Sequence, residues 1–107
     1  WMLPDPTVVC SETVEFILLF SIENRVPIFT FSDKYVEMGA TMSMSIDTFD
    51  LGRQAGEMAQ KILAGAAIRD IPEAEPREIV ISVNVKVAGK LGLSLSDKII
   101  GEAKIIK

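Results

Sequence analysis

Histidine is absent from this sequence of 107 residues, and cysteine occurs once. Histidine is both the commonest metal ligand and the commonest general base, so its absence argues against a zinc site and against a catalytic triad. A single cysteine cannot form an intramolecular disulfide, and we expect Cys10 to be a small thiol that is buried or half-buried. We therefore expect no metal, no cofactor and no enzymatic activity.

Concentrated positive charge and long apolar runs are missing as well. The formal net charge is −4 and the Lys and Arg residues are scattered, so the chain offers no basic stripe for nucleic acid and we expect it to bind none. Apolar residues make up 49% of the sequence, yet no run approaches the roughly 20 residues that a membrane-spanning helix needs. Because so short a chain is unusually apolar, we expect another copy to cover part of its surface in a homo-oligomer.

The sequence does contain four strand-like runs, each followed by a polar turn and a helix-like run. These runs are residues 1–3, 26–31, 40–46 and 78–85, and the first is cut off just before Pro4-Asp5-Pro6. The alternation predicts an α/β fold with a mostly parallel sheet flanked by helices, sampled from the middle of a larger protein. Ligands of such sheets bind outside the carboxyl ends of the strands. The polar residues near these ends are Asp5, Ser32, Asp33, Asp47 and Asn84.

Two long helices are predicted, at residues 12–24 and 48–64. Ser11 is the expected N-cap of the first helix, and Asp47 or Thr48 is the expected N-cap of the second. The second helix has the clearer periodicity, because its apolar residues share one face. They are Leu51, Ala55, Met58, Ala59, Ile62 and Leu63.

Three finer expectations concern the second of these helices. Gly52 and Gly56 lower its intrinsic stability, so we expect the helix to pack closely on a neighbour there. Glu57 and Lys61 have the spacing of a favourable ion pair on the outer face. Gly65 is placed to take the left-handed conformation that ends the helix.

Shorter elements are predicted between and after these helices. Residues 32–39 contain a short turn or helical piece that ends at Gly39. Asn84 can cap a short helix that Gly92 closes, and Ser96 can cap a last helix. The apolar residues of that last helix are Ile99, Ile100, Ala103 and Ile106.

Residues 40–46 alternate strictly between two kinds of side chain. Met42, Met44 and Ile46 lie on one side of the predicted strand, and the other side carries Thr41, Ser43 and Ser45. The pattern predicts a packed methionine face and a polar hydroxyl face. The methionines either fill the core or line an apolar ligand pocket in an adaptable way.

A set of short motifs occurs in a characteristic order along the whole chain. They are Leu3-Pro4-Asp5-Pro6, Val26-Pro27-Ile28-Phe29, Phe31-Ser32-Asp33, Gly39-Ala40, Ile46-Asp47, Leu51-Gly52-Arg53-Gln54-Ala55, Ile62-Leu63-Ala64-Gly65, Ile71-Pro72 and Val83-Asn84-Val85-Lys86, with Ala88 and Leu91-Gly92-Leu93. In this order and spacing they resemble the ABC-transporter substrate-binding protein family of the type that includes tryptophan and tyrosine binders. We therefore expect residues 1–107 to be the C-terminal part of such a protein.

The resemblance implies a two-lobed, type I periplasmic-binding-protein fold with the ligand in the cleft between the lobes. By this analogy residues 1–31 and 78–107 belong to the C-terminal lobe, and residues from about 40 to 65 belong to the other lobe. It also implies an ABC permease as partner of the full-length protein. The implied location is periplasmic or otherwise extracytoplasmic, with a membrane-anchored lipoprotein as one form.

The resemblance also implies ligand-binding residues. Asp5 matches the family's acidic residue at the cleft end of a strand, and Ser32 with Asp33 matches its serine-acidic pair. Pro6 stands where members with a known amino-acid ligand tend to have asparagine, and we include it among the ligand-binding candidates. A carboxylate in a closed cleft suits a ligand ammonium group. The alternatives are that Asp5 forms an Asx turn or a helix cap, and that the pair Ser32 and Asp33 only caps a helix.

Three classes of function remain open. The leading interpretation is a solute-binding component of an ABC importer that binds a small molecule, such as an amino acid, without catalysis. The second is a ligand-sensing extracytoplasmic module of a signalling protein, since the same fold can precede an effector segment. The third is a parallel α/β enzyme, although the sequence contains neither a Gly-x-Ser-x-Gly nucleophile elbow nor a phosphate-binding glycine loop.

Overall fold

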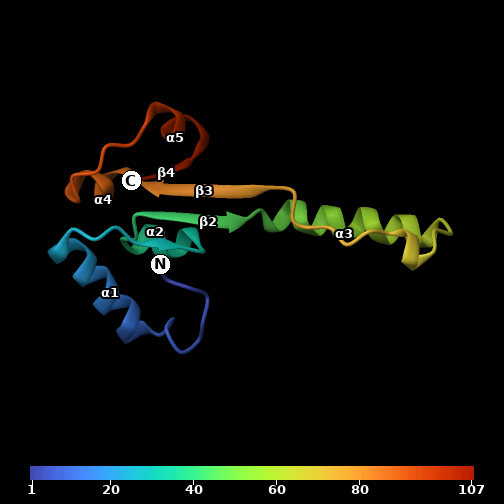
Figure 1. Ribbon diagram of the computed structural model, residues 1–107, viewed down its shortest axis with the longest axis horizontal. Helices are drawn as coiled ribbons and strands as arrows, with labels where there is room; N and C mark the ends of the chain where they lie inside the picture. Colours follow the sequence, from blue (N-terminus) through green and yellow to red (C-terminus); the bar gives the residue numbers. More distant parts are fainter. The chain divides into compact units, whose positions relative to one another are not determined.

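The computed structural model describes residues 1–107 and has the predicted α/β fold (Figure 1). Its elements are α1 (Ser11–Asn24), β1 (Phe29–Thr30), α2 (Asp33–Met38), β2 (Met42–Ile46), α3 (Thr48–Leu63), a short 3₁₀ turn η1 (Ile68–Asp70), β3 (Ile79–Asn84), α4 (Val85–Lys90), α5 (Asp97–Glu102) and β4 (Lys104–Ile106). None of the helices combines the length and the apolar character that crossing a bilayer requires.

The chain divides into two compact units. The first unit comprises Trp1–Ser45 and Val80–Lys107, and the second comprises Ile46–Ile79. The first unit holds most of the sheet and four of the five α-helices, whereas the second holds α3, the turn η1 and the segment that returns to β3.

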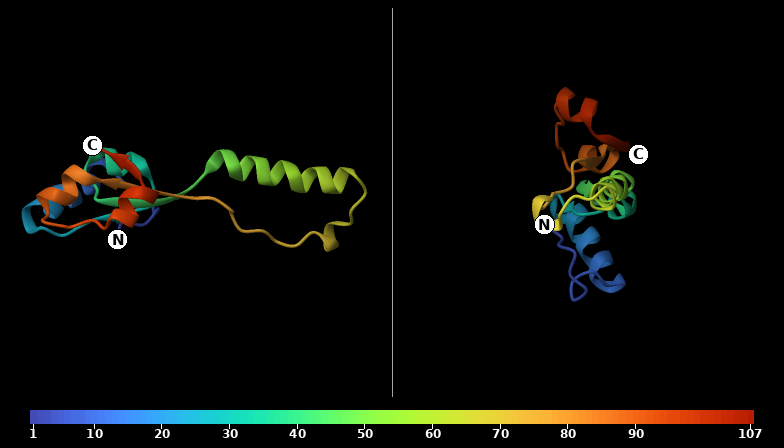
Figure 2. Two further views of the ribbon diagram at one scale, coloured as in Figure 1. Left: turned by 90° about the horizontal axis from the view of Figure 1, so that it is seen from above. Right: turned by 90° about the vertical axis from the view of Figure 1, so that its right-hand side faces the viewer.

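The sheet has four strands in the order β1-β2-β3-β4. β1 pairs with β2 in parallel, and so does β3 with β4. β2 and β3 run in opposite directions (Figure 1), with a bond from the backbone N–H of Asn84 to the carbonyl of Thr41 at 2.9 Å. The predicted mostly parallel sheet is therefore confirmed, with one antiparallel pair at its centre. Figures 1 and 2 show α1 beside the β1 edge and α5 beside the β4 edge.

The strand predicted at residues 26–31 is much shorter in the structure. Only Phe29–Thr30 forms a strand, because the N–H of Ile28 donates to the Thr41 side chain at 3.0 Å instead of to a neighbouring strand. Before it, the N–H of Met2 donates to the carbonyl of Phe29 at 2.9 Å. Residues 1–3 therefore lie beside β1, next to the strand that follows them in the chain.

The first helix begins one residue earlier than predicted. Ser11 is its first residue rather than its cap, and Cys10 is the N-cap, with an extended backbone and no side-chain capping bond. The carbonyl of Cys10 accepts a hydrogen bond from the N–H of Val14 at 2.9 Å, so the helical hydrogen bonding begins one residue nearer the N-terminus than predicted. The Cys10 side chain is exposed, so the expected buried or half-buried thiol is wrong.

The last predicted helix is also too long. α5 ends at Glu102, and Ala103 has an extended backbone with φ −90° and ψ 150°. Ile106, which we assigned to the helix, lies in β4 and pairs with Asn84 of β3. The adjacent residues Ile105 and Ile106 fit a strand as well as a helix. They form a strand here because they pair with β3.

The buried face of β2 is the opposite of the predicted one. Ser43 is fully buried, with 0% of its surface exposed, whereas Met44 is 46% exposed. Thr30 lies opposite Ser43 in the parallel register, and the pairing of β2 with β3 puts Ser82 on its other side. These three hydroxyls are fully buried and have no hydrogen-bond partner. The methionine face is thus not the core of this unit.

The core of the first unit forms where α1 and α2 meet the start of β1. Its buried residues are Met2, Val14, Ile28, Val36 and Ala40. The short helix α2 follows the prediction: Ser32 is its N-cap and Gly39, with φ +129°, ends it. Asn84 fixes α2 to β3, since its side-chain N–H donates to the carbonyl of Val36 at 3.0 Å.

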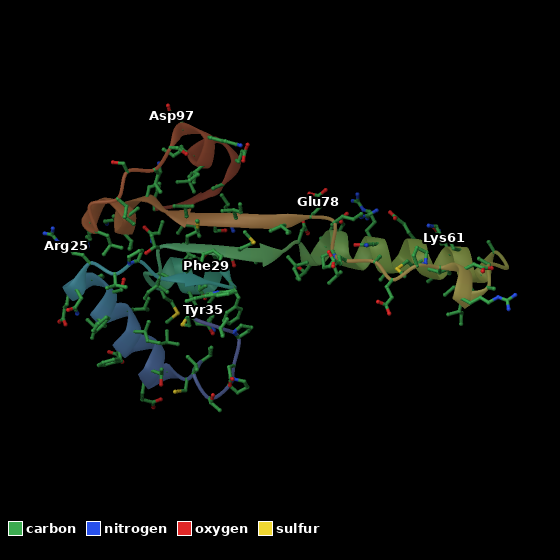
Figure 3. The ribbon with its side chains drawn as sticks, viewed as in Figure 1. Arg25, Phe29, Tyr35, Lys61, Glu78 and Asp97 are labelled. Atoms are coloured by element: carbon green, nitrogen blue, oxygen red, sulfur yellow. The ribbon has the colours of Figure 1, made fainter.

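The second unit is built around α3, which agrees closely with the predicted helix. The Asp47 carboxylate accepts the N–H groups of Phe49 and Asp50 at 2.9 and 3.0 Å, so Asp47 is the N-cap. Gly65 has φ +102°, as its predicted role requires. The N–H of Asp47 also donates to the carbonyl of Glu78, the residue labelled just before β3 in Figure 3.

The side-chain environment of α3 differs from the prediction. Leu63, on the predicted apolar face, is 87% exposed, and a Cβ added at Gly52 or Gly56 would meet nothing within 4 Å. The expected close packing at these glycines is therefore not found. Glu57 pairs with Arg77 at 2.8 Å rather than with Lys61, because Arg77 also binds Asp50 and draws both carboxylates to one guanidinium.

Candidate functional site

The candidate residues lie where residues 1–3 and β1 end at one edge of the sheet. Asp5 and Pro6 line a shallow hollow of about 330 Å³ together with Pro4, Val9 and Phe31. Phe31 directly precedes Ser32 and Asp33 in the chain. Of the predicted site residues, Asp5 and Pro6 line this hollow, whereas Ser32 and Asp33 follow Phe31 in the chain and do not line it.

Asp5 has an ordered and exposed carboxylate. Its Oδ1 accepts the N–H of Thr7 at 2.9 Å and the hydroxyl of Thr7 at 2.7 Å. These two hydrogen bonds lower the pKa of Asp5 below its usual value, the side-chain bond contributing most. The backbone turns here as well, since the carbonyl of Asp5 accepts the N–H groups of Val8 and Val9.

The Asx turn predicted as the alternative role of Asp5 is thus present. It occupies Oδ1, whereas Oδ2 makes no hydrogen bond within the first unit. The turn fixes the carboxylate in one orientation, and the second oxygen remains able to accept a bond from a ligand. The structural role and the binding role are therefore compatible.

Ser32 and Asp33 lie at the beginning of α2. The hydroxyl of Ser32 accepts the N–H of Lys34 at 3.4 Å, which is a long capping bond. The Asp33 carboxylate accepts the ammonium of Lys104 at 2.8 Å. This bond is the main cause that lowers the pKa of Asp33, and it raises the pKa of Lys104. Asp33 therefore already has a cationic partner from β4.

Aromatic side chains border the same region. The rings of Phe31 and Tyr35 lie 5.4 Å apart at an interplanar angle of 59°, and Tyr35 is labelled on α2 in Figure 3. The Lys34 ammonium lies 5.8 Å from the Tyr35 ring centroid. Such tilted ring pairs present apolar faces that can pack against a ligand.

Two neighbours of the candidate residues were not expected from the sequence: Phe31, which lines the hollow with Asp5, and Lys104, which pairs with Asp33. The signal for Phe31 was its position as the last apolar residue of a strand-like run, directly before Ser32. Lys104 carried no such signal, because residues 104–106 were assigned to a helix and its partner Asp33 is 71 residues away in the sequence.

The two other polar residues near strand ends serve the fold. Asp47 caps α3. Asn84 is buried, and its side-chain oxygen accepts the N–H of Val87 at 3.0 Å while its nitrogen donates to Val36. Both ends of the Asn84 amide are thus used within the protein, as its predicted capping role requires.

The groups at this edge of the sheet are suited to binding a small molecule. An ionised carboxylate with one free oxygen offers a charge-assisted hydrogen bond, and Phe31 adds an apolar surface beside it. No cluster of three or more carboxylate, cysteine or histidine side chains is placed to hold a metal ion.

Comparison with known sequences gives one family match and two curated relatives. The profile of the family described as "ABC transporter substrate binding protein" matches residues 1–107. A tyrosine-binding protein of Clostridioides difficile is 37% identical over 62 residues, which are 58% of this chain and 18% of that protein. An uncharacterized protein of Rickettsia prowazekii is 34% identical over 62 residues, or 58% of this chain and 20% of that protein.

Solved structures give matches over nearly the whole chain. A ligand-free, open substrate-binding protein with adhesive properties from Clostridium difficile has a TM-score of 0.80 and 28% identity, over 98% of this chain and 34% of its own. An ABC domain in complex with L-Trp from Streptococcus pneumonia has a TM-score of 0.62 and 28% identity, over 86% of this chain and 32% of its own. The chain thus spans about a third of the length of these two solved relatives.

Proposed function

We propose that this chain, which belongs to the ABC transporter substrate-binding protein family, is part of a solute-binding protein that holds a small molecule in a cleft and presents it to an ABC importer. The observation that carries the proposal is the Asp5 carboxylate, fixed by Thr7 through one oxygen and free at the other, beside the apolar surface of Phe31. The site binds its ligand without catalysis.

The proposed ligand carries an ammonium group and an apolar or aromatic part, as an amino acid does. The Asp5 carboxylate accepts the ammonium, while Pro6 and Phe31 contact the apolar part and the Ser32 hydroxyl supplies a further polar contact. Support comes from the relatives, one of which is named a tyrosine-binding protein and another of which was solved with L-Trp. A charge-assisted bond to Asp5 becomes stronger when the cleft closes and excludes water.

The proposed arrangement assigns the two units to different lobes. Residues 1–31 and 78–107 belong to the C-terminal lobe, and residues from about 40 to 65 cross to the other lobe. The division of the chain into Trp1–Ser45 with Val80–Lys107 and Ile46–Ile79 supports this assignment except at residues 40–45, which lie in the first unit, and 78–79, which lie in the second. In this proposal the chain crosses between the lobes near the end of β2 and near the start of β3.

The proposed setting follows from the family. The full-length protein acts outside the cytoplasm, in the periplasm or as a membrane-anchored lipoprotein, and delivers its ligand to an ABC permease. Large apolar side chains exposed on α1, such as Phe16 and Leu19, support the further proposal that copies of the chain associate.

The ligand proposal is tested by titrating the full-length gene product in a calorimeter with L-tryptophan and L-tyrosine. The matched controls are the same compounds without the α-ammonium group, indolepropionate and hydroxyphenylpropionate. We expect binding of at least one amino acid and an affinity roughly 30-fold or more lower for its control, since the control leaves the carboxylate without a partner. Equal affinities, or no binding of either amino acid, would contradict the proposal.

A further inference from the structure

The ion pair between Lys104 and Asp33 joins two elements that are far apart in the sequence. The Lys104 ammonium donates to Oδ2 of Asp33 at 2.8 Å, so β4 reaches the first turn of α2. Lys104 is held by its strand, because it pairs in register with Ser82 of β3. The pairing of β4 with β3 therefore determines that Lys104 lies beside Asp33.

Asp33 of this pair follows the carboxyl end of β1, from which Phe31 also extends. Asp5 shares its hollow with Phe31, and Asp33 follows Phe31 by two residues. The hydrogen bonds that the Asp5 carboxylate accepts come from Thr7, which is neutral. Of these two carboxylates, one is thus neutralised by a lysine and the other keeps its charge.

We propose that Lys104 sets the charge of the binding site and thereby its ligand class. With Lys104 on Asp33, Asp5 is the one of the two candidate-site aspartates that has no ion-pair partner, and the site selects ligands with a single ammonium group over ligands with two. Without Lys104, both candidate-site aspartates would lack an ion-pair partner, and the site would favour a second cationic group. The inference rests on the proposed solute-binding function and adds a specificity-determining residue to it.

The physical basis is competition for Asp33. A second ligand ammonium must displace Lys104 from a 2.8 Å bond before it gains a bond of the same kind, so the exchange brings little net free energy. Removing Lys104 removes this competitor. Lys104 and Asp33 keep 54% and 40% of their side-chain surfaces exposed, so solvent screens the effect and its size is moderate.

The test compares L-tryptophan, with one ammonium group, and L-lysine, with two, as calorimetric probes of the full-length gene product. In Lys104→Met we expect the ratio of the two affinities to move about three- to tenfold towards L-lysine. In the double variant Lys104→Met with Asp33→Asn the ratio should return towards that of the wild type. Lys98→Met is the matched control, because it removes one exposed lysine of the same unit that makes no ion pair.

A carbon-detected NMR titration of Asp33 supplies a readout independent of binding. The pKa of Asp33 should rise in Lys104→Met and stay unchanged in Lys98→Met, because only Lys104 donates to its carboxylate. An affinity ratio that is the same in wild type and Lys104→Met, while L-tryptophan still binds, would overturn this inference alone. If neither probe binds to any variant, the proposed function fails and this inference fails with it, whatever the NMR titration shows.

Discussion

The two units of this chain are stabilised in different ways. The first unit has an apolar core around Val36 and Ile28. Three of its buried hydroxyl side chains lie in the strands themselves; they are Thr30, Ser43 and Ser82. In the second unit only Gln54 is buried, and its side-chain N–H donates to the carbonyl of Glu75 at 2.9 Å. Local caps and polar contacts define the second unit, whereas packing between distant segments defines the first.

The difference shows what a clear helical pattern can and cannot establish. The periodic apolar face of α3 predicted the helix correctly, but Leu51 and Leu63 on that face are exposed. The irregular region around α2, with a weaker pattern, contains the fully buried Val36. A periodic pattern thus reports the conformation of a segment, and burial depends on what packs against it.

The largest contrast is expected from truncating one apolar side chain in each unit. Val36→Ala removes two methyl groups from a site with 0% exposure and should lower local stability by about 2–3 kcal/mol. Leu63→Ala, at 87% exposure, should change it by no more than about 0.5 kcal/mol. Native-state hydrogen exchange of the full-length gene product measures both. Equal effects would mean that the second unit has a core after all.

A second contrast separates two buried threonines of the first unit. The Thr41 hydroxyl accepts the buried N–H of Ile28 at 3.0 Å, so Thr41→Val should cost about 1–2 kcal/mol. The Thr30 hydroxyl is buried without a partner, so Thr30→Val should be neutral or stabilising by up to about 1 kcal/mol. Exchange of the Met42 amide, which donates to Ile28, reports both variants. A substantial loss in Thr30→Val would show that its hydroxyl has a partner, such as a buried water.

The smallest effect is expected at the cap of α3. Asp47→Ala should destabilise the helix by about 1 kcal/mol, because the N–H groups of Phe49 and Asp50 lose their acceptor. Asp47→Asn should cost much less, since asparagine caps nearly as well. Amide exchange along α3 distinguishes the two variants. An equal loss in both would point to a role for the charge of Asp47 beyond capping.

The parts of the fold that sequence could predict are those with local causes. Asp47 and Gly65 bound α3, and Ser32 and Gly39 bound α2, because caps and left-handed glycines act over a few residues. The Asx turn of Asp5 is local in the same sense, and it was among the alternatives.

The features that sequence could not predict depend on distant contacts. The buried side of β2 is the hydroxyl side, where Ser43 lies between strands β1 and β3, and alternation within one strand does not reveal which of its two faces is buried. β4 forms because Lys104 and its neighbours pair with β3, which a helical spacing of isoleucines cannot reveal. The partner of Asp33 depends on that same pairing.

The most direct test of the account is the affinity of the full-length Asp5→Asn variant for L-tryptophan and for indolepropionate, measured by calorimetry beside the wild type. Asparagine preserves the turn with Thr7, so the fold should remain, which circular dichroism checks. We expect L-tryptophan to bind roughly 30-fold to several-thousand-fold more weakly to the variant, with little change for indolepropionate. An unchanged affinity for L-tryptophan would contradict the central claim that Asp5 binds the ligand ammonium.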